Sequence, residues 1–109
     1  MQRLTIANAL AQLAGHDKPF KTLFEHGSLV VEMYQPKSVD LQQPHSRDEI
    51  YVIAQGQGYF INGGQKQAVE VGEVLFAPAG AEHRFVDFSE DFATWVFFYG
   101  PEGGESDNG

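Results

Sequence analysis

Short segments rich in β-branched and aromatic residues recur between residue 20 and residue 99, and Gly, Pro or Asn residues separate them. One separator, Asn62-Gly63-Gly64, is a strong signal for a tight hairpin. Short strands at regular spacing, with turn residues between them, are typical of an antiparallel β-barrel or jelly roll. The pattern therefore predicts an all-β fold with strands at residues 20–25, 29–34, 41–45, 50–54, 59–61, 67–71, 74–77, 82–86 and 93–99.

The segment before the first strand has a helical pattern. Residues 5–14 read TIANALAQLA, with Thr5 suited to cap the N-terminus and Gly15 suited to follow the last turn. The apolar residues share one face, and a helix this short must pack on the barrel to be stable. We therefore expect a helical segment over residues 1–19, one barrel over residues 20–100 and a flexible acidic tail over residues 101–109.

The length and charge of the chain limit what it can be. Its 109 residues suit a single domain with a real core. A formal net charge of −8 argues against binding to nucleic acid or to an anionic membrane, because both reward clustered Lys and Arg. The absence of Cys excludes Cys-ligated zinc and iron–sulfur sites, and no apolar segment is long enough to span a bilayer. We expect a soluble cytoplasmic protein.

Two stretches place metal-binding side chains beside predicted strands. In the first, Gln43, His45 and Glu49 are separated by even intervals, so they would share one face of an extended chain. In the second, His83 follows the turn signal Pro78-Ala79-Gly80 and leads into a short strand. Two imidazoles and one carboxylate on neighbouring strands would form a two-His-one-carboxylate metal site, with coordination positions open for substrate or water.

The spacing of these residues is similar to the two signature motifs of the cupin family. The first signature, H-x-H-x(3,4)-E-x6-G, corresponds here to Gln43-x-His45-x3-Glu49-x6-Gly56. The second, G-x5-P-x-G-x2-H-x3-N, corresponds to Gly72-x5-Pro78-x-Gly80-x2-His83-x3-Asp87. The resemblance covers roughly residues 20–100 and implies a small cupin-type antiparallel barrel or jelly roll, to which the N-terminal helix is added.

The resemblance also implies that His45, Glu49 and His83 hold a divalent metal ion, for which Zn, Fe, Mn and Ni are the first candidates. Gln43 stands where the family has its first His, and an amide oxygen binds transition metals more weakly than imidazole does. It either completes the metal site or makes a hydrogen bond that orients a ligand or a water. Asp87 replaces the family's Asn, and both residue types suit the same local turn.

Aromatic residues surround the two motifs. If Glu49 points inward, alternation sends Tyr51 inward as well, and Phe85 shares the parity of His83. Tyr51 is therefore the candidate catalytic residue that would position a substrate. Two interpretations are open for the aromatic set, either the wall of an apolar pocket for a small organic molecule or a filled core. The set comprises Tyr51, Phe60, Phe85, Trp95 and Phe97.

Three functions are compatible with this pattern. Resemblance to cupin enzymes implies a metal-dependent dioxygenase, isomerase or decarboxylase that acts on a small molecule. The same barrel could instead bind a metal or small ligand without catalysis, or carry a decayed site, as the replacement at Gln43 suggests. Residues 50–53 and 95–99 are apolar on both faces, so their outer faces need cover from the N-terminal helix or a second subunit. Together with the resemblance, this predicts a homodimer.

Overall fold

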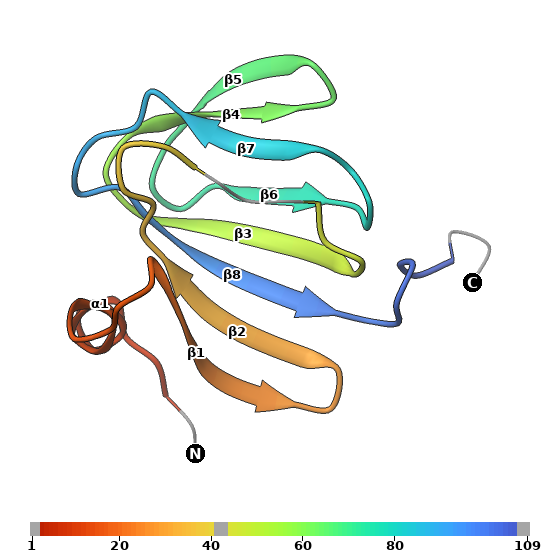
Figure 1. The fold of residues 1–109 in the computed structure, drawn as a ribbon, viewed down its shortest axis with the longest axis horizontal. Coiled ribbons are helices and arrows are strands. Elements are labelled where there is room, and N and C mark those ends of the chain that lie inside the picture. Colours follow the sequence, from red (N-terminus) through yellow and green to blue (C-terminus); the bar gives the residue numbers. More distant parts are fainter. Residues whose placement is uncertain (1–2, 41–43, 107–109) are drawn as a thin grey trace.

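A computed structural model of the protein describes residues 3–40 and 44–106 (Figure 1). Within these ranges the chain forms one helix and eight strands, and all paired strands are antiparallel. In chain order they are α1 (Ile6–Ala14), β1 (Phe20–His26), β2 (Leu29–Tyr34), β3 (Asp48–Gln55), β4 (Gly58–Asn62), β5 (Gln65–Val69), β6 (Val74–Ala77), β7 (His83–Val86) and β8 (Ala93–Tyr99).

The described strands form two sheets that pack face to face. The larger sheet has the order β1-β2-β8-β3-β6, and the smaller has the order β5-β4-β7. Their side chains meet in one core, which includes Tyr51, Ile53 and Val96 from the larger sheet and Phe60 and Phe85 from the smaller one. The prediction of an all-β antiparallel jelly roll is confirmed, although the described strands make two facing sheets and not one closed barrel.

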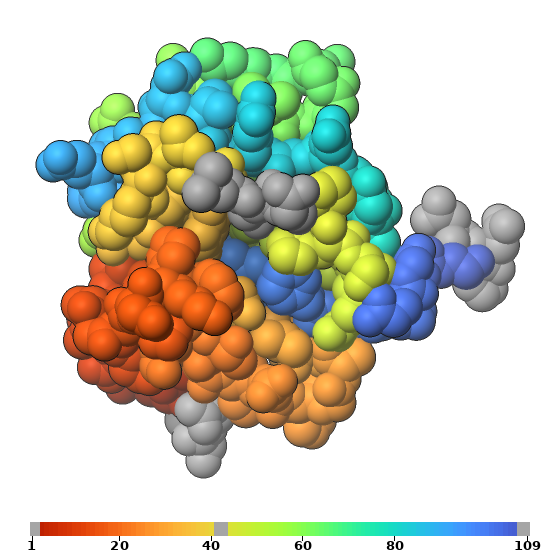
Figure 2. All heavy atoms as spheres, in the orientation of Figure 1, coloured from red at the N-terminus to blue at the C-terminus, as the bar shows by residue number. Residues whose placement is uncertain are grey.

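The register between strands decides which side chains face this core. Glu49 of β3 pairs with Phe98 of β8. Val96, two residues earlier in β8, pairs with Tyr51 on one side and Glu32 on the other. Paired residues lie on the same side of a sheet, so both glutamates and Tyr51 face inward. Figure 2 shows part of β8, in blue, at the bottom of a hollow between the orange β1 and β2 and the yellow-green start of β3.

Helix α1 packs on the outer face of the larger sheet. Thr5 caps it, because its hydroxyl oxygen accepts a hydrogen bond of 3.1 Å from the N–H of Asn8. Ala9 and Leu13 are buried in a cluster with Met33, Ala54, Ala93 and the partly buried Trp95. The predicted helix and its packing are therefore confirmed. In the part of the chain that the structure describes, no helix is both long and apolar enough to cross a membrane.

Positive backbone φ angles account for two predicted turns. Asn62 pairs with Gln65, which leaves Gly63 and Gly64 as a two-residue hairpin loop with φ of +61° and +85°. A loop of this kind needs left-handed conformations at both positions, which Gly adopts without steric cost. Asp87 has φ of +51°, a conformation that Asn and Asp tolerate better than other side chains do. The turn role predicted for Asp87 is confirmed.

The residues that follow β8 differ from the expected flexible tail. The N–H groups of Glu105 and Ala79 donate to the two carboxylate oxygens of Asp48 at 2.8 and 3.0 Å. The N–H of Gly103 donates to the carbonyl oxygen of Ser46 at 2.6 Å. The bonds from Glu105 and then Ala79 hold the pKa of Asp48 below its ordinary value. Residues 103–105 are thus attached to the start of β3, and the expectation is corrected for them.

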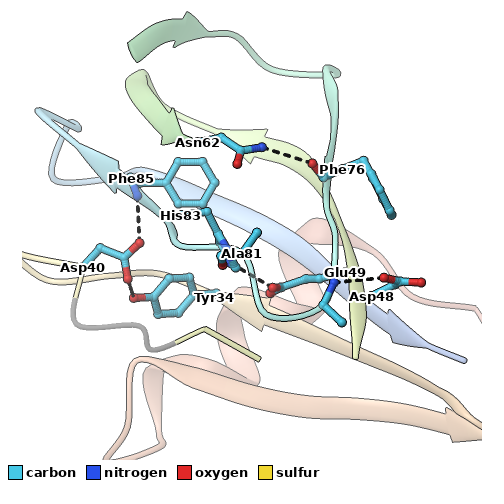
Figure 3. Close-up of polar contacts among 10 residues, drawn as sticks. Tyr34, Asp40, Asp48, Glu49, Asn62, Phe76, Ala81, His83 and Phe85 are labelled. Carbon is cyan, nitrogen blue, oxygen red and sulfur yellow. Dashed lines mark hydrogen bonds and ion pairs between the residues drawn. The ribbon is translucent and has the colours of Figure 1, made fainter. Parts of the chain in front are cut away.

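A buried carboxylate in the connection between β2 and β3 joins the two sheets. One oxygen of Asp40 accepts a hydrogen bond from the Tyr34 hydroxyl at 2.5 Å, and the other accepts one from the N–H of Phe85 at 2.8 Å (Figure 3). Tyr34 belongs to β2 of the larger sheet, and Phe85 belongs to β7 of the smaller one. Burial, and then the bond to Asp40, raise the pKa of Tyr34, so its hydroxyl stays protonated and donates.

Asp40→Ala is expected to lower the free energy of unfolding by roughly 2–4 kcal/mol, because the Phe85 N–H and the Tyr34 hydroxyl lose a buried acceptor. Asp40→Asn is the matched control. Its amide oxygen can accept from Phe85 while its N–H donates to the Tyr34 oxygen, so the loss should be smaller. Urea unfolding followed by Trp95 fluorescence measures both variants. A loss below about 0.5 kcal/mol for Asp40→Ala would contradict the bridging role.

Candidate metal centre

A buried His–Glu pair lies at the inner face of the larger sheet. Nε2 of His83 is 2.9 Å from Oε1 of Glu49, and the two side chains are 2% and 1% exposed (Figure 3). Glu49 of β3 pairs with Ala77, the last residue of β6. The turn that follows includes Gly80 with φ of +80°, and the chain then enters β7 at His83. The turn predicted from the sequence therefore brings the imidazole to the carboxylate.

The second ring nitrogen of His83 fixes the orientation of the ring. Nδ1 lies 2.8 Å from the carbonyl oxygen of Ala81, and a carbonyl can only accept, so Nδ1 carries a proton. Nε2 then faces Glu49. Burial alone would lower the pKa of His83, but its hydrogen bonds to Glu49 and Ala81, with the charges of Glu49 and Asp40, outweigh burial and raise the pKa. Nε2 is thus held where it can donate to Glu49 or bind a cation.

The Glu49 carboxylate has few partners for a buried charged group. Apart from the contact with Nε2 of His83, neither oxygen has a hydrogen bond to any described residue. Buried carboxylates are normally paired and hydrogen-bonded, or coordinate a metal. An imidazole whose far nitrogen bonds to a backbone carbonyl is also the usual arrangement of a metal-binding His. Nitrogen and carboxylate oxygen donors suit divalent transition metals, so the donors of Glu49 and His83 fit such an ion.

His45 lies beside this pair without joining it. Its ring centroid is 6.3 Å from that of His83 and 4.7 Å from that of Phe98. The N–H of Gly80 donates to the His45 carbonyl oxygen at 2.7 Å, so the backbones of the two motifs are joined. Across the described ranges, no three His, Asp or Glu side chains are grouped so as to hold a metal ion. Gln43 lies outside the described residues, and the complete metal site stays a prediction.

A cavity of about 530 Å³ opens beside the pair. Its apolar lining includes Phe20, Val96 and Phe98. Its polar lining includes two of the predicted ligands, His45 and Glu49. Apolar walls with a few convergent polar groups, in a cavity of this volume, are typical of a site for a small organic molecule.

Two charged residues of the cavity wall, Glu32 and Arg47, were not identified from the sequence. Glu32 accepts a hydrogen bond of 3.1 Å from the Thr22 hydroxyl. Burial raises the pKa of Glu32. The bond from Thr22 lowers this pKa by a smaller amount, and the charge of Glu49 raises it further. A signal for Glu32 was present, since a charged residue interrupts the apolar segment 29–34. A signal for Arg47 was present as well, since it lies between His45 and Glu49 with the same even spacing.

Two aromatic residues predicted for the pocket lie on the opposite face of the sheet. Phe97 pairs with Ile50, the residue next to Glu49, and therefore points outward. Trp95 packs with Met33 in the cluster under α1. Their parity depends on the register between β3 and β8, which no local sequence pattern encodes. The prediction that they line the pocket is corrected for both.

The other three aromatic residues of the predicted set fill the core. Tyr51, Phe60 and Phe85 are buried, with their ring centroids 4.9 to 5.6 Å apart. None of them is among the described residues that line the cavity. Tyr51 does face inward with Glu49, and its ring centroid is 5.7 Å from that of His83. It packs beside the imidazole, and a catalytic role for Tyr51 stays a prediction.

Structural comparison finds the same fold in solved proteins of low sequence identity. A cupin-2 domain containing protein from Shewanella frigidimarina has a TM-score of 0.72 at 15% identity, with 89% of this chain and 94% of that chain covered. KdgF from Halomonas sp. has a TM-score of 0.64 at 21% identity, with 75% and 80% covered. These likenesses show the fold alone.

Sequence comparison identifies the family. An uncharacterized protein from Streptomyces coelicolor is 31% identical over 94 residues, which cover 84% of this chain and 90% of that protein. Residues 30–99, more than half of the chain, match the family described as Cupin domain. The two signature spacings, the jelly-roll fold and this match agree, and the chain belongs to the cupin family.

Proposed function

We propose that this cupin holds a divalent metal ion at His45, Glu49 and His83 and acts on a small organic molecule in the adjoining cavity. The observation that carries the proposal is the buried Glu49–His83 pair, whose carboxylate has no further hydrogen bond to the described residues. The cavity of about 530 Å³ includes Glu49 and His45 in its wall. Because predicted metal ligands line the cavity, an ion bound there would be open to a substrate, as in a catalytic site, and would not be enclosed as in a structural site.

The side chains of this site would have separate roles. Ala81 holds the His83 ring through Nδ1, so Nε2 keeps its direction. Glu49 supplies a negative charge that offsets a cation, while Phe20 and Phe98 present apolar surface to a carbon skeleton and exclude water. A bound divalent ion supplies Lewis acidity, which polarises a substrate oxygen or activates water or dioxygen. The reaction we propose is that of a dioxygenase, an isomerase or a decarboxylase.

A second candidate function is ligand binding without catalysis. It is favoured by the contact of 2.9 Å between Glu49 and His83, because a protonated imidazole satisfies the carboxylate without any metal ion. The distance of 6.3 Å between the rings of His45 and His83 also favours it. Dioxygen consumption by iron-loaded protein would support the enzyme, whereas tight ligand retention without turnover would support the binding protein.

Elemental analysis of the purified protein tests the proposal. We expect about one transition-metal ion per chain, with Zn, Fe, Mn and Ni measured together, and a clear loss in His45→Ala. His26→Ala is the control, because it removes an exposed imidazole at the end of β1 and should keep the ion. Protein that carries no ion, and takes up none of these four metals when they are added, would overturn the proposal.

We also propose a homodimer formed through the outer face of the larger sheet. Val74 and Phe76 of β6 are 66% and 51% exposed. They pair with Val52 and Ile50 of β3, so the apolar surface continues across two strands. Helix α1 covers a different part of this face, around Met33. A second copy suits the uncovered part, because these four side chains bring no charge into contact between chains of net charge −8.

Phe76→Glu is expected to weaken dimerisation at least about tenfold, because it places a carboxylate in an apolar contact and repeats it on both copies. Val39→Glu is the control, since Val39 is a 58% exposed apolar residue outside the named strands. Sedimentation equilibrium measures both variants. Wild-type protein that stays monomeric at about 100 µM would contradict the proposed dimer.

A further inference from the structure

Arg47 is a half-buried cation in the cavity wall. Its Nε donates to the carbonyl oxygen of Gly100 at 3.0 Å. Its Nη2 is buried and has no hydrogen-bond partner within the described ranges. Nor does Arg47 form an ion pair with any described residue. A buried guanidinium donor without an acceptor is unfavourable, so an acceptor is expected at this position.

The two carboxylates of the same cavity already have other partners. Glu49 contacts His83 at 2.9 Å, and Glu32 accepts from Thr22 at 3.1 Å. Arg47 is paired with neither, although the chain has 15 Asp and Glu residues against 7 Lys and Arg. In a chain this acidic, a cavity cation that no described carboxylate neutralises is suited to an acidic ligand.

We propose that Arg47 binds the carboxylate of a small monocarboxylic acid in this cavity. A guanidinium presents parallel N–H donors that match the two oxygens of a carboxylate. The bond from Nε to Gly100 restrains the guanidinium before a ligand arrives, which lowers the entropic cost of binding. The apolar wall, which includes Phe98, would contact the carbon skeleton of the acid.

The cavity favours a carboxylate over a phosphate group. Glu32 and Glu49 share the wall with Arg47, and their negative charge repels a dianion more strongly than a monoanion. A role for Arg47 in holding the segment at Gly100 uses only Nε, and leaves Nη2 without a function. The inference rests on the proposed function, because the acid is the molecule on which that same cavity acts.

Binding to metal-free protein tests the inference. EDTA treatment followed by dialysis removes metal ions, so that an acid cannot bind through one. Each acid probe is compared with its amide, which has nearly the same shape and no charge. The pairs are benzoate with benzamide, isobutyrate with isobutyramide and lactate with lactamide. Phenylphosphonate is added as a dianion. NMR titration of isotope-labelled protein gives each Kd. We expect at least one acid to bind at least about tenfold more tightly than its amide, and more tightly than phenylphosphonate, with a shift of the Arg47 Nε–H resonance.

Arg47→Gln is expected to remove the preference for acid over amide, because Gln keeps N–H donors and loses the charge. Arg84→Gln is the matched control, since it makes the same change of charge at an exposed position of β7 and should keep the preference. If Arg47→Gln does not fold, the wild-type titration decides, because an acid that binds elsewhere leaves the Arg47 Nε–H resonance unmoved.

Any of four results would overturn the inference: no acid binds better than its amide, Arg47→Gln keeps the preference, phenylphosphonate binds most tightly, or the preferred acid leaves the Arg47 Nε–H resonance unmoved. These results are separable from those that test the metal site. A preference for acids in protein that never takes up a metal supports the role of Arg47 and removes the metal-dependent function. Metal uptake without a preference for acids supports the metal site and removes the proposed role of Arg47.

Discussion

Replacing His83 with Ala is expected to abolish metal uptake and to destabilise the protein even without metal. Losing a predicted ligand should lower metal affinity at least about 100-fold, more than the loss of a group that only orients a ligand. The Glu49 carboxylate also loses its contact at 2.9 Å while it stays buried. Breaking a buried ion pair from one side costs about 3–5 kcal/mol, and we expect the lower end of this range. Calorimetric zinc titration and urea unfolding of metal-free protein measure the two effects.

A double variant shows how much of the instability of His83→Ala comes from the unpaired charge of Glu49. Combining His83→Ala with Glu49→Ala removes the unpaired charge, so the combined loss in free energy of unfolding should be smaller than the sum of the single losses. His26→Ala, at an exposed position, should change neither affinity nor stability. Unchanged metal affinity in His83→Ala would show that the ion binds elsewhere.

Gly56→Ala is expected to lower the free energy of unfolding by more than about 3 kcal/mol, or to prevent folding. Gly56 follows β3 with φ of +82°, a conformation in which any side chain is strained. An added Cβ would lie 2.6 Å from Oγ of Ser89 and 2.7 Å from Cα of Phe92. The Phe92 backbone has little room to move, because its side chain is fully buried in the core. The glycine of the first motif is thus required by close packing as well as by its backbone angle.

Gly63→Ala is the control for the backbone angle alone. Gly63 has φ of +61°, and an added Cβ there meets no heavy atom within 4 Å. Gly63→Ala should therefore lower the free energy of unfolding by only about 1–2 kcal/mol, the cost of a left-handed conformation. Thermal and urea unfolding of both variants give the comparison. Equal losses for Gly56→Ala and Gly63→Ala would mean that the contacts at Gly56 impose no extra cost.

Much of the fold could be predicted from local patterns. Residues 29–34, 74–77 and 93–99 were predicted as strands with the bounds that the structure has. Their apolar runs end at turn residues, so sequence alone marks both ends. The other described strands were placed to within one or two residues. The predicted strand at residues 41–45 lies partly outside the described residues, and its described residues, Pro44 and His45, are not in a strand. For residues 50–54 the strand extends to Asp48–Gln55, because pairing with β8 continues beyond the apolar residues.

The site could be predicted only where its residues follow a fixed spacing. The contact between Glu49 and His83 agrees with the motif spacing. Asp40 and Arg47 act through partners 45 and 53 residues away, at Phe85 and Gly100, and no local pattern points to such contacts. Strand register has the same long-range character, since an offset of one residue exchanges the two faces of a strand.

The N–H of Phe85 reports how often the contact between β7 and the buried Asp40 opens. It is bonded to Asp40 between the two sheets, so it can exchange with deuterated solvent only when that bond opens. The exchange rate at this one amide therefore measures the free energy needed to open the contact that Asp40 makes between the two sheets. The intensity of a single amide cross-peak, followed during deuterium exchange, therefore reports the stability of the contact that joins the two sheets.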